Sequence, residues 1–437
     1  MTVTTRRLGA SVGLVLAAAL FGGTVAGSVV LDAPAAHADQ IRDLQYWLTD
    51  YGFTEAWNTT RGAGVTVAVI DSGVDGSIAE LKGAVTGGTD VSGLGSADGQ
   101  TPVAGDDDEG QHGTLVASLL AGRGTGDGTG LIGVAPEVSI LAVSVGFGST
   151  RSTVTNDDQI AQGIRWAVDN GADVINMSLT RNTLYWPESW DDAFLYAFEN
   201  DVVVVAAAGN RGSGTTEVGA PATIPGVLAV GGVDRNKTAS FDASSQGITI
   251  AVSAPSEKLV GVMPDSTYVQ WDGTSAAAPI VSGLVALVRA AYPDLDAAGV
   301  MNRVIATANA NGQSVPSPIY GNGLIDAAAA VTRSVAPATG ATPTELLTEW
   351  ITLHRRAEIE VVPTEVPVEE APAAAEDPAL PAQNALTAWL PTQLTLTYIS
   401  LPLAVLVGFG ILVTLFGIGA TRHIKRIRCN PKDFAQS

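Results

Sequence analysis

Five apolar runs in the middle of the chain lack the polar alternation of strands that face solvent on one side. They span residues 64–70, 138–145, 172–178, 201–208 and 248–254. Runs of this kind are typical of strands buried on both faces. Apolar residues recur at helical spacing between the runs, over residues 113–122, 157–171 and 188–200. The alternation predicts an α/β fold with a mostly parallel β-sheet flanked by helices on both faces.

A longer apolar segment follows the last of these strands. Residues 275–293 read "SAAAPIVSGLVALVRAAYP" and are apolar enough that a helix there must be buried. The pattern continues to about residue 335. We therefore expect one α/β domain over residues 63–335, preceded by an extension over residues 39–62 whose aromatic residues pack on it.

The N-terminus has the pattern of an export signal. Arg6 and Arg7 precede an apolar run, and the small-residue site "AHA" ends at Ala38. This order is typical of a secretory signal peptide over residues 1–38. The run is long for a signal peptide, so an uncleaved membrane anchor is the alternative.

The C-terminal part has the pattern of a membrane anchor. Residues 398–420 contain no charged side chain and are long enough for one transmembrane helix. The basic tail over residues 421–437 predicts a cytoplasmic C-terminus, because positive flanks stay inside. Residues 336–397 are rich in Pro and Glu and predict an extended stalk. The domain is thereby expected outside the cell, on a single-pass anchor in the cell membrane.

Charge and cysteine content exclude several classes of protein. The chain has a net charge of −21, and residues 39–335 hold 33 acidic against 14 basic side chains. Binding nucleic acid requires a basic face, so a nucleic-acid partner is excluded. The single cysteine, Cys429, cannot form a disulfide within the chain or a cysteine metal cluster.

Four residues with hydrolytic chemistry stand where predicted strands end or predicted helices begin. They are Asp71, His112, Asn210 and Ser275. Active sites of α/β sheets lie beyond the carboxyl ends of the strands. An imidazole can take the proton of a serine hydroxyl, and a buried carboxylate orients that imidazole. Asp71, His112 and Ser275 fit these roles, and the Asn210 amide and the Ser275 N–H fit as donors to an oxyanion.

Two neighbouring features keep alternatives open. Asp75 follows Asp71 by four residues and competes with it, although a turn residue is the simpler interpretation. The acidic run Asp106–Glu109 offers oxygen ligands for a structural Ca²⁺, but without a diagnostic spacing a solvated loop is the simpler interpretation. The proposed chemistry requires no cofactor and no metal.

The chain order Asp, His, Ser excludes two common hydrolase architectures. Chymotrypsin-like enzymes have the order His, Asp, Ser, and α/β-hydrolases have Ser, Asp, His with a G-x-S-x-G elbow. The segments "VAVIDSGVDG", "GQHGTLVASLLAG", "AAAGN" and "WDGTSAAAPIVSGLVALV" resemble the signature blocks of the subtilisin (subtilase) family of serine proteases. The resemblance covers residues 40–335.

The resemblance implies residue roles and a substrate class. It implies a serine endopeptidase acting on proteins and peptides, with the triad Asp71, His112 and Ser275 and with Asn210 in the oxyanion hole. Residues that the resemblance implies in substrate binding are Gly146, Ser178, Leu179 and Gly209. Thr180 departs from the glycine that often follows in the family.

The domain plan resembles one branch of the family. A signal peptide, a short extension, a stalk, one membrane helix and a basic tail are similar to the mycosins, membrane-anchored subtilases of type VII secretion. The resemblance implies association with that secretion machinery. Mycosins commonly carry disulfides, and this chain departs from them there. A scaffold in a secretion or envelope complex, with catalysis secondary, is the alternative function.

Overall fold

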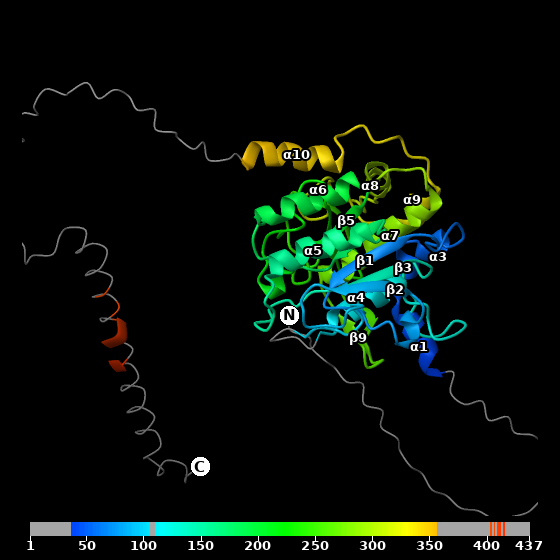
Figure 1. Cartoon of the computed structure of the whole chain (residues 1–437), viewed down its shortest axis with the longest axis horizontal. Coiled ribbons are helices and arrows are strands. Elements are labelled where there is room, and N and C mark those ends of the chain that lie inside the picture. Colours follow the sequence, from blue (N-terminus) through cyan, green and yellow to red (C-terminus); the bar gives the residue numbers. More distant parts are fainter. Residues whose placement is uncertain are drawn as a thin grey trace, which may run out of the picture. The chain divides into compact units, whose positions relative to one another are not determined.

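A computed structural model describes residues 36–104 and 110–355, with a few further positions between residues 403 and 415. The chain divides into two compact units, residues 1–358 and 359–437. The first unit holds the α/β domain (Figure 1). Within the second unit, the described positions are helical and exposed.

One parallel sheet forms the centre of the domain. Its spatial order is β2-β3-β1-β4-β5-β6-β7. The strands in chain order are β1 (Thr66–Asp71), β2 (Val85–Asp90), β3 (Ser139–Ser144), β4 (Val174–Met177), β5 (Val203–Ala207), β6 (Leu228–Val233) and β7 (Ile250–Pro255). A separate antiparallel hairpin joins β8 (Leu259–Val262) to β9 (Tyr268–Trp271). The mostly parallel sheet predicted from the sequence is confirmed.

Helices cover both faces of this sheet, as expected for strands without polar alternation. One face packs on α4 (His112–Ala121) and α7 (Thr274–Ala291), and α8 (Ala297–Ala306) and α9 (Ala327–Thr332) pack in turn on α7. The other face packs on α5 (Asn156–Asp169) and α6 (Asp191–Glu199) (Figure 1). Along β1, Val67 and Val69 belong to the first core, and Ala68 and Ile70 belong to the second. The period of two along a strand thus supplies two separate cores.

The sequence pattern missed two strands of the sheet, each of which contains a pair of glycines. Strand β2 reads "VTGGTD", lies at the sheet edge and is only partly buried. Strand β6 reads "LAVGGV" and is buried throughout. Glycine disfavours a strand and provides no side chain to the apolar pattern. Pairing with β3 and with β5 and β7 therefore defines these strands more than their own composition does.

The N-terminal extension is docked on the domain through α1 (Ala36–Leu44), α2 (Tyr46–Asp50) and α3 (Phe53–Ala56). Trp47 and Phe53 are fully buried, which confirms the expected packing of the aromatic residues. The buried Gln45 amide exchanges two hydrogen bonds with the Ile132 backbone, at 2.7 Å and 3.0 Å. Truncating one such buried aromatic typically costs about 3–5 kcal/mol, so the extension is part of the folded domain.

The folded domain continues beyond residue 335, into the segment that the sequence pattern placed in the stalk. Helix α10 (Pro343–His354) begins with a capping box between Thr342 and Glu345. It packs on α6 and buries Leu347 completely. The apolar face of α10 and this cap are signals of a docked helix, so a stalk can begin only after residue 355. Residues 356–397 of the predicted stalk lie outside the described residues.

The membrane segments predicted from the sequence lie mostly outside the described residues. Within the described part, one helix is long and apolar enough to cross a membrane, namely α7. Its apolar window is 83% buried inside the domain, so α7 is a core helix. The predicted signal peptide and basic tail, and most of the predicted transmembrane helix, lie outside the described residues.

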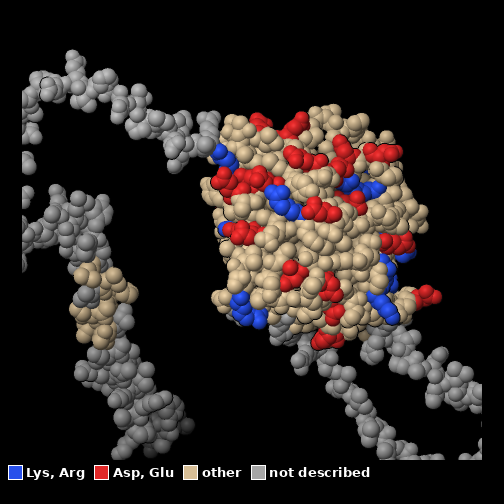
Figure 2. Space-filling view, viewed as in Figure 1, with Lys and Arg blue, Asp and Glu red and all other residues tan. Residues whose placement is uncertain are grey.

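Acidic side chains outnumber basic ones on the face of the domain shown in Figure 2. This agrees with the excess of Asp and Glu over Lys and Arg in the chain. A net negative surface disfavours binding to nucleic acid, which needs a basic face.

Candidate active site

The four candidate residues come together at the carboxyl end of the parallel sheet. Asp71 is the last residue of β1, and Asn210 follows β5 by three residues. His112 is the first residue of α4, and Ser275 is the second residue of α7. All four line one cleft of about 640 Å³. The sequence prediction placed them at strand ends and helix starts, and the structure places them in a single site.

Asp71 and His112 are joined directly. The Nδ1 atom of His112 lies 2.8 Å from Oδ1 and 3.0 Å from Oδ2 of Asp71. Asp71 is 1% exposed, and its Oδ1 also accepts the Ser72 N–H. A carboxylate only accepts hydrogen bonds, so the proton of a neutral His112 resides on Nδ1. Nε2 then carries the lone pair that a general base needs.

A close approach of backbones holds this pair together. A Cβ atom at position 113 would lie 2.1 Å from the carbonyl oxygen of Gly73. Only glycine fits there, so Gly113 lets the start of α4 contact the loop after β1. The edge of the Trp271 ring lies against His112, with centroids 5.6 Å apart. The imidazole is thus fixed by a carboxylate and an aromatic ring.

Ser275 and Asn210 are held by the first turn of α7. The Oδ1 atom of Asn210 accepts hydrogen bonds from the N–H and the hydroxyl of Thr274, at 2.8 Å and 3.0 Å. This orientation turns the Nδ2 donors of Asn210 away from Thr274. The Ser275 hydroxyl donates to the Ser178 carbonyl at 3.1 Å. The Ser275 N–H lies in the first helical turn, where N–H groups have no partner within the helix.

Gly273 makes the approach of Asn210 to α7 possible. Its φ angle is +144°, and a Cβ atom there would lie 3.1 Å from the Asn210 Nδ2 atom. Both the backbone angle and the space favour glycine. The "DGTS" sequence therefore positions a serine and an amide donor next to each other.

The structure separates the residues implied in substrate binding into two groups. Ser178 and Leu179 line the cleft, as the resemblance implies. Gly146 and Gly209 are not among its lining residues. The Gly146 N–H donates to the buried Gln159 side chain at 2.8 Å, and the Gly209 N–H donates to the Thr274 hydroxyl at 3.0 Å. Both N–H groups therefore have structural partners.

Asp75, the competing carboxylate, is absent from the residues that line the cleft. Its Oδ1 accepts hydrogen bonds from the backbone and the hydroxyl of Ser77, at 2.9 Å and 2.6 Å. This is the local pattern of a turn residue. Asp71, and not Asp75, is the carboxylate that contacts His112.

The cleft has a second wall that the sequence pattern did not predict. This wall consists of Asp157 and Ile160 from α5, Arg181 after β4, and Trp190. Arg181 pairs with the Asp157 carboxylate, and its guanidinium lies 5.5 Å from the Trp190 ring centre. The Trp190 indole N–H donates to the Asp157 carbonyl at 2.9 Å. Single ion pairs between distant elements leave no periodic signal in a sequence.

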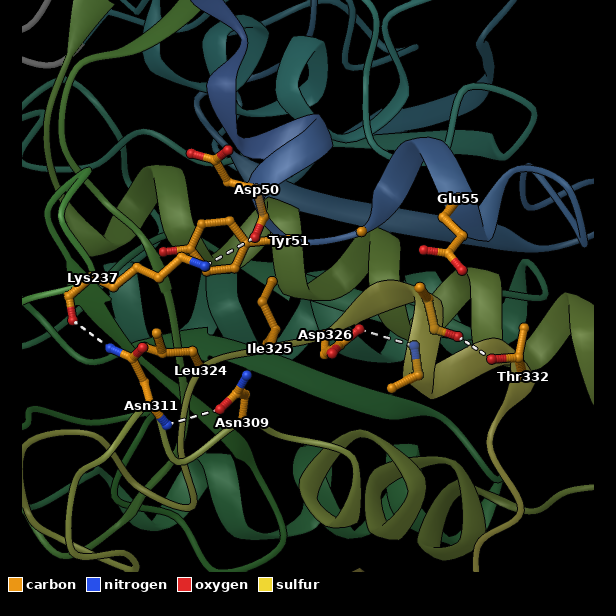
Figure 3. A pocket seen from close by; sticks show the side chains of 13 residues that line it. Asp50, Tyr51, Glu55, Lys237, Asn309, Asn311, Leu324, Ile325, Asp326 and Thr332 are labelled. Carbon is orange, nitrogen blue, oxygen red and sulfur yellow. Dashed lines mark hydrogen bonds between the residues drawn. The ribbon is translucent and has the colours of Figure 1, made fainter.

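A separate hollow of about 390 Å³ lies where the N-terminal extension meets α9 (Figure 3). Its polar groups are largely engaged in the fold. The Lys237 ammonium donates to the Asp50 carbonyl at 3.2 Å, and Asp326 Oδ1 accepts the Ala329 N–H at 2.9 Å (Figure 3). Asp326 thereby caps α9. The contact between Lys237 and Asp50 joins the extension to the domain.

Metal ligation was an open alternative at the acidic run. No group of three or more His, Cys, Asp or Glu side chains in the described part of the chain is arranged to hold a metal ion. The run Asp106–Glu109 lies outside the described residues.

Comparisons with known proteins agree with this geometry. The model of the subtilase family matches residues 62–323. Subtilisin DY of Bacillus licheniformis is 40% identical over 274 residues, which cover 62% of this chain and 92% of the relative. Thermitase of Thermoactinomyces vulgaris is 37% identical over 234 residues, covering 54% and 78% of the two chains.

Solved structures of mycosins also match. MycP1 from Mycobacterium smegmatis is 30% identical with a TM-score of 0.56, covering 68% of this chain and 87% of that one. MycP3 from the type VII (ESX-3) secretion system is 32% identical with a TM-score of 0.55, covering 66% and 88%. The chain therefore belongs to the subtilase family and is a serine endopeptidase, with mycosins among its structural neighbours.

Proposed function

We propose that the chain is a membrane-anchored, extracytoplasmic serine endopeptidase that uses Asp71, His112 and Ser275 as its catalytic triad. The observation that carries this proposal is the pair of contacts between His112 Nδ1 and the buried Asp71 carboxylate, in the cleft that Ser275 also lines. The pair leaves Nε2 of His112 as the base. Ser275, which lines the same cleft, then completes the triad as the nucleophile.

In the first half of the reaction, His112 Nε2 takes the proton of the Ser275 hydroxyl as Oγ attacks the carbonyl carbon of the peptide. His112 then gives that proton to the leaving amine nitrogen as the peptide bond breaks, and an acyl-enzyme remains on Ser275. Water then attacks the acyl carbon and gives its proton to His112, and His112 returns a proton to Ser275 Oγ as the bond to the acyl group breaks and the acid leaves. Asp71 stabilises the imidazolium throughout, because it is buried and already hydrogen-bonded to Nδ1.

The developing oxyanion is assigned to two donors, the Asn210 Nδ2 group and the Ser275 N–H. Thr274 supports this role because it engages only Oδ1 of Asn210 and so orients the other end of the amide. Donors fixed before the reaction need no reorganisation when charge develops. The Ser275 hydroxyl points to the Ser178 carbonyl in this structure and has to rotate from it to attack.

The membrane anchor is proposed over residues 398–420. Leu403, Leu406, Phe409, Ile411 and Leu415 are described as helical and exposed, with exposed fractions between 56% and 68%. A helix with such a surface is stable in lipid rather than in water. The basic residues that follow favour a cytoplasmic C-terminus and an extracytoplasmic domain.

Association with type VII secretion is proposed from the neighbours. Solved structures similar to this chain include MycP1 from the ESX-1 and MycP3 from the ESX-3 type VII secretion systems. The docked extension and the predicted anchor support the same role. Peptide and protein segments in an extended conformation are the proposed substrates.

The test is covalent labelling of the purified protein with a fluorophosphonate probe. We expect the wild type to take one label and Ser275→Ala to take none. Ser213→Ala is the matched control, because Ser213 is an exposed serine that lines the same cleft, and it should label like the wild type. A wild type that stays unlabelled would refute the proposed triad. Secretion supported in cells by Ser275→Ala would favour a scaffold role.

A further inference from the structure

The C-terminal helix of the domain contacts the segment that precedes α6. Trp350 of α10 packs against Trp186 with its ring tilted by 36°, and the ring centres are 4.2 Å apart. Arg355, just after α10, donates to the Trp186 carbonyl at 3.0 Å. Its guanidinium also lies 5.2 Å from the centre of the Trp350 ring. Trp350 and Arg355 therefore contact both the ring and the backbone of Trp186.

A buried carboxylate joins this contact to α6. Arg355 donates to Asp191 through Nε at 2.8 Å and through a terminal nitrogen at 3.4 Å. The indole N–H of Trp186 donates to the same carboxylate at 2.7 Å. The Asp191 side chain is 7% exposed, and Arg355 is 24% exposed. Asp191 is the first residue of α6, where the helix dipole also favours a negative charge.

The next residue toward the N-terminus is part of the cleft. Trp190 lines the cleft wall and is 1% exposed. Its indole N–H donates to the Asp157 carbonyl, and Arg181 lies over its ring. From Arg355 to the wall there are two steps, Arg355 to Asp191 and Asp191 to its covalent neighbour Trp190.

The geometry of the ion pair favours positioning over stability. A buried pair gains little net free energy, because desolvation offsets its attraction. Arginine instead fixes orientation, since its planar group donates along several directions at once. The guanidinium of Arg355 donates to the Asp191 carboxylate and to the Trp186 carbonyl. These two contacts together define where residues 186–191 lie.

We propose that Arg355 is a positioning residue, which together with α10 sets the place of the Trp190 wall and so the selection of substrate side chains that reach it. This inference rests on the proposed function, because it assumes that peptides occupy the cleft. Beside the Arg181–Asp157 ion pair, the wall presents the apolar side chains of Ile160 and Trp190, and Leu179 also lines the cleft. The side chains selected there are therefore apolar ones.

The test uses the purified full chain and a positional-scanning library of internally quenched peptides. In the wild type, we expect one substrate position at which a large apolar side chain is preferred over alanine by about tenfold or more, the range that one pocket contact supplies. Arg355→Ala should reduce that preference to less than about threefold, through KM. Peptides with alanine at that position should keep their kcat, and the rate of fluorophosphonate labelling should not change.

Three variants separate positioning from folding. Arg289→Ala removes an ion pair with Asp201 outside the cleft and should keep the wild-type preference. Arg355→Lys keeps the charge beside Asp191 but cannot make both sets of contacts, so it should restore thermal stability more than preference. If Arg355→Ala does not fold, adding Asp191→Asn removes the unpaired buried charge, and the double variant should fold with the preference reduced.

The outcomes are distinct from those of the proposed function. A labelled wild type with no apolar preference, or an Arg355→Ala protein with unchanged preference, overturns the role of Arg355 and leaves the triad intact. An equal loss in Arg289→Ala overturns it as well, because the effect would then follow general stability. A wild type that takes no label instead contradicts the triad itself.

Discussion

The side-chain amide of Asn210 has two separate functions, one at each end, and replacing the residue by alanine tests both. Nδ2 is the proposed oxyanion donor, and Oδ1 accepts two hydrogen bonds from the buried Thr274. Asn210→Ala removes both functions. We therefore expect a catalytic loss and a loss of stability, and each can be calculated from different contacts.

The catalytic loss follows from the donor. Removing one such side-chain donor lowers kcat by ~10²–10³, or about 2.7–4 kcal/mol, a range that itself comes from a subtilisin. The loss of stability follows from Thr274, since its buried N–H loses its acceptor, at a cost of about 1–3 kcal/mol. KM should change little, because the oxyanion exists only after the attack.

The assay combines steady-state cleavage of a peptide substrate with urea denaturation of the same preparations. Thr274→Ala is the control, because it removes the hydroxyl contacts but keeps the N–H to Oδ1. It should lose stability with a decrease in kcat of less than about tenfold. A folded Asn210→Ala enzyme with a kcat within about tenfold of the wild type would refute the assignment.

Two further predictions concern the domain around the site. Gln45→Ala should lower the free energy of unfolding by about 1–3 kcal/mol for each Ile132 backbone group that loses its partner, measured by urea denaturation; an unchanged midpoint would contradict docking of the extension. Burial raises the pKa of Asp90, but hydrogen bonds from Ser92, Ser144 and Gly95 outweigh it and lower the pKa overall. The ionised Asp90 carboxylate therefore stabilises the folded protein above the usual aspartate pKa, and this stabilisation is lost as pH falls through the lower pKa of the folded state. Asp90→Asn should accordingly destabilise the protein at neutral pH and progressively less in acid. A stability difference independent of pH would count against this reasoning.

The strands with strong apolar runs were predictable because their own residues are almost all apolar, as strands buried on both faces require. β1, β4 and β5 are short and rich in Val and Ile, and both faces of each are covered by helices. β2 and β6 were missed because neighbouring strands, rather than their own residues, decide their conformation. The segment that forms helix α10 was placed in the stalk, because nothing local shows that Leu347 docks on α6.

The candidate site divides in the same way. Asp71, His112, Asn210 and Ser275 were identifiable because each stands in a distinctive local motif at a strand end or a helix start. The wall of Asp157, Arg181 and Trp190 was not, since it depends on contacts between α5 and two later loops. Gly146 and Gly209 lie outside the lining of the cleft, and their N–H groups are hydrogen-bonded inside the fold, so their role in substrate binding stays a prediction.

The docked extension has a consequence for the order of folding during synthesis of the chain. The Tyr46 hydroxyl donates to the Glu257 carbonyl, 211 residues later, and the Ala327 N–H donates to the Tyr51 carbonyl. Contacts of such sequence separation form late, because the intervening chain has to be ordered first. The extension is synthesised first, yet its partners arrive only when α9 has been made. The part of the domain that is made earliest is therefore among the last to be fixed in place.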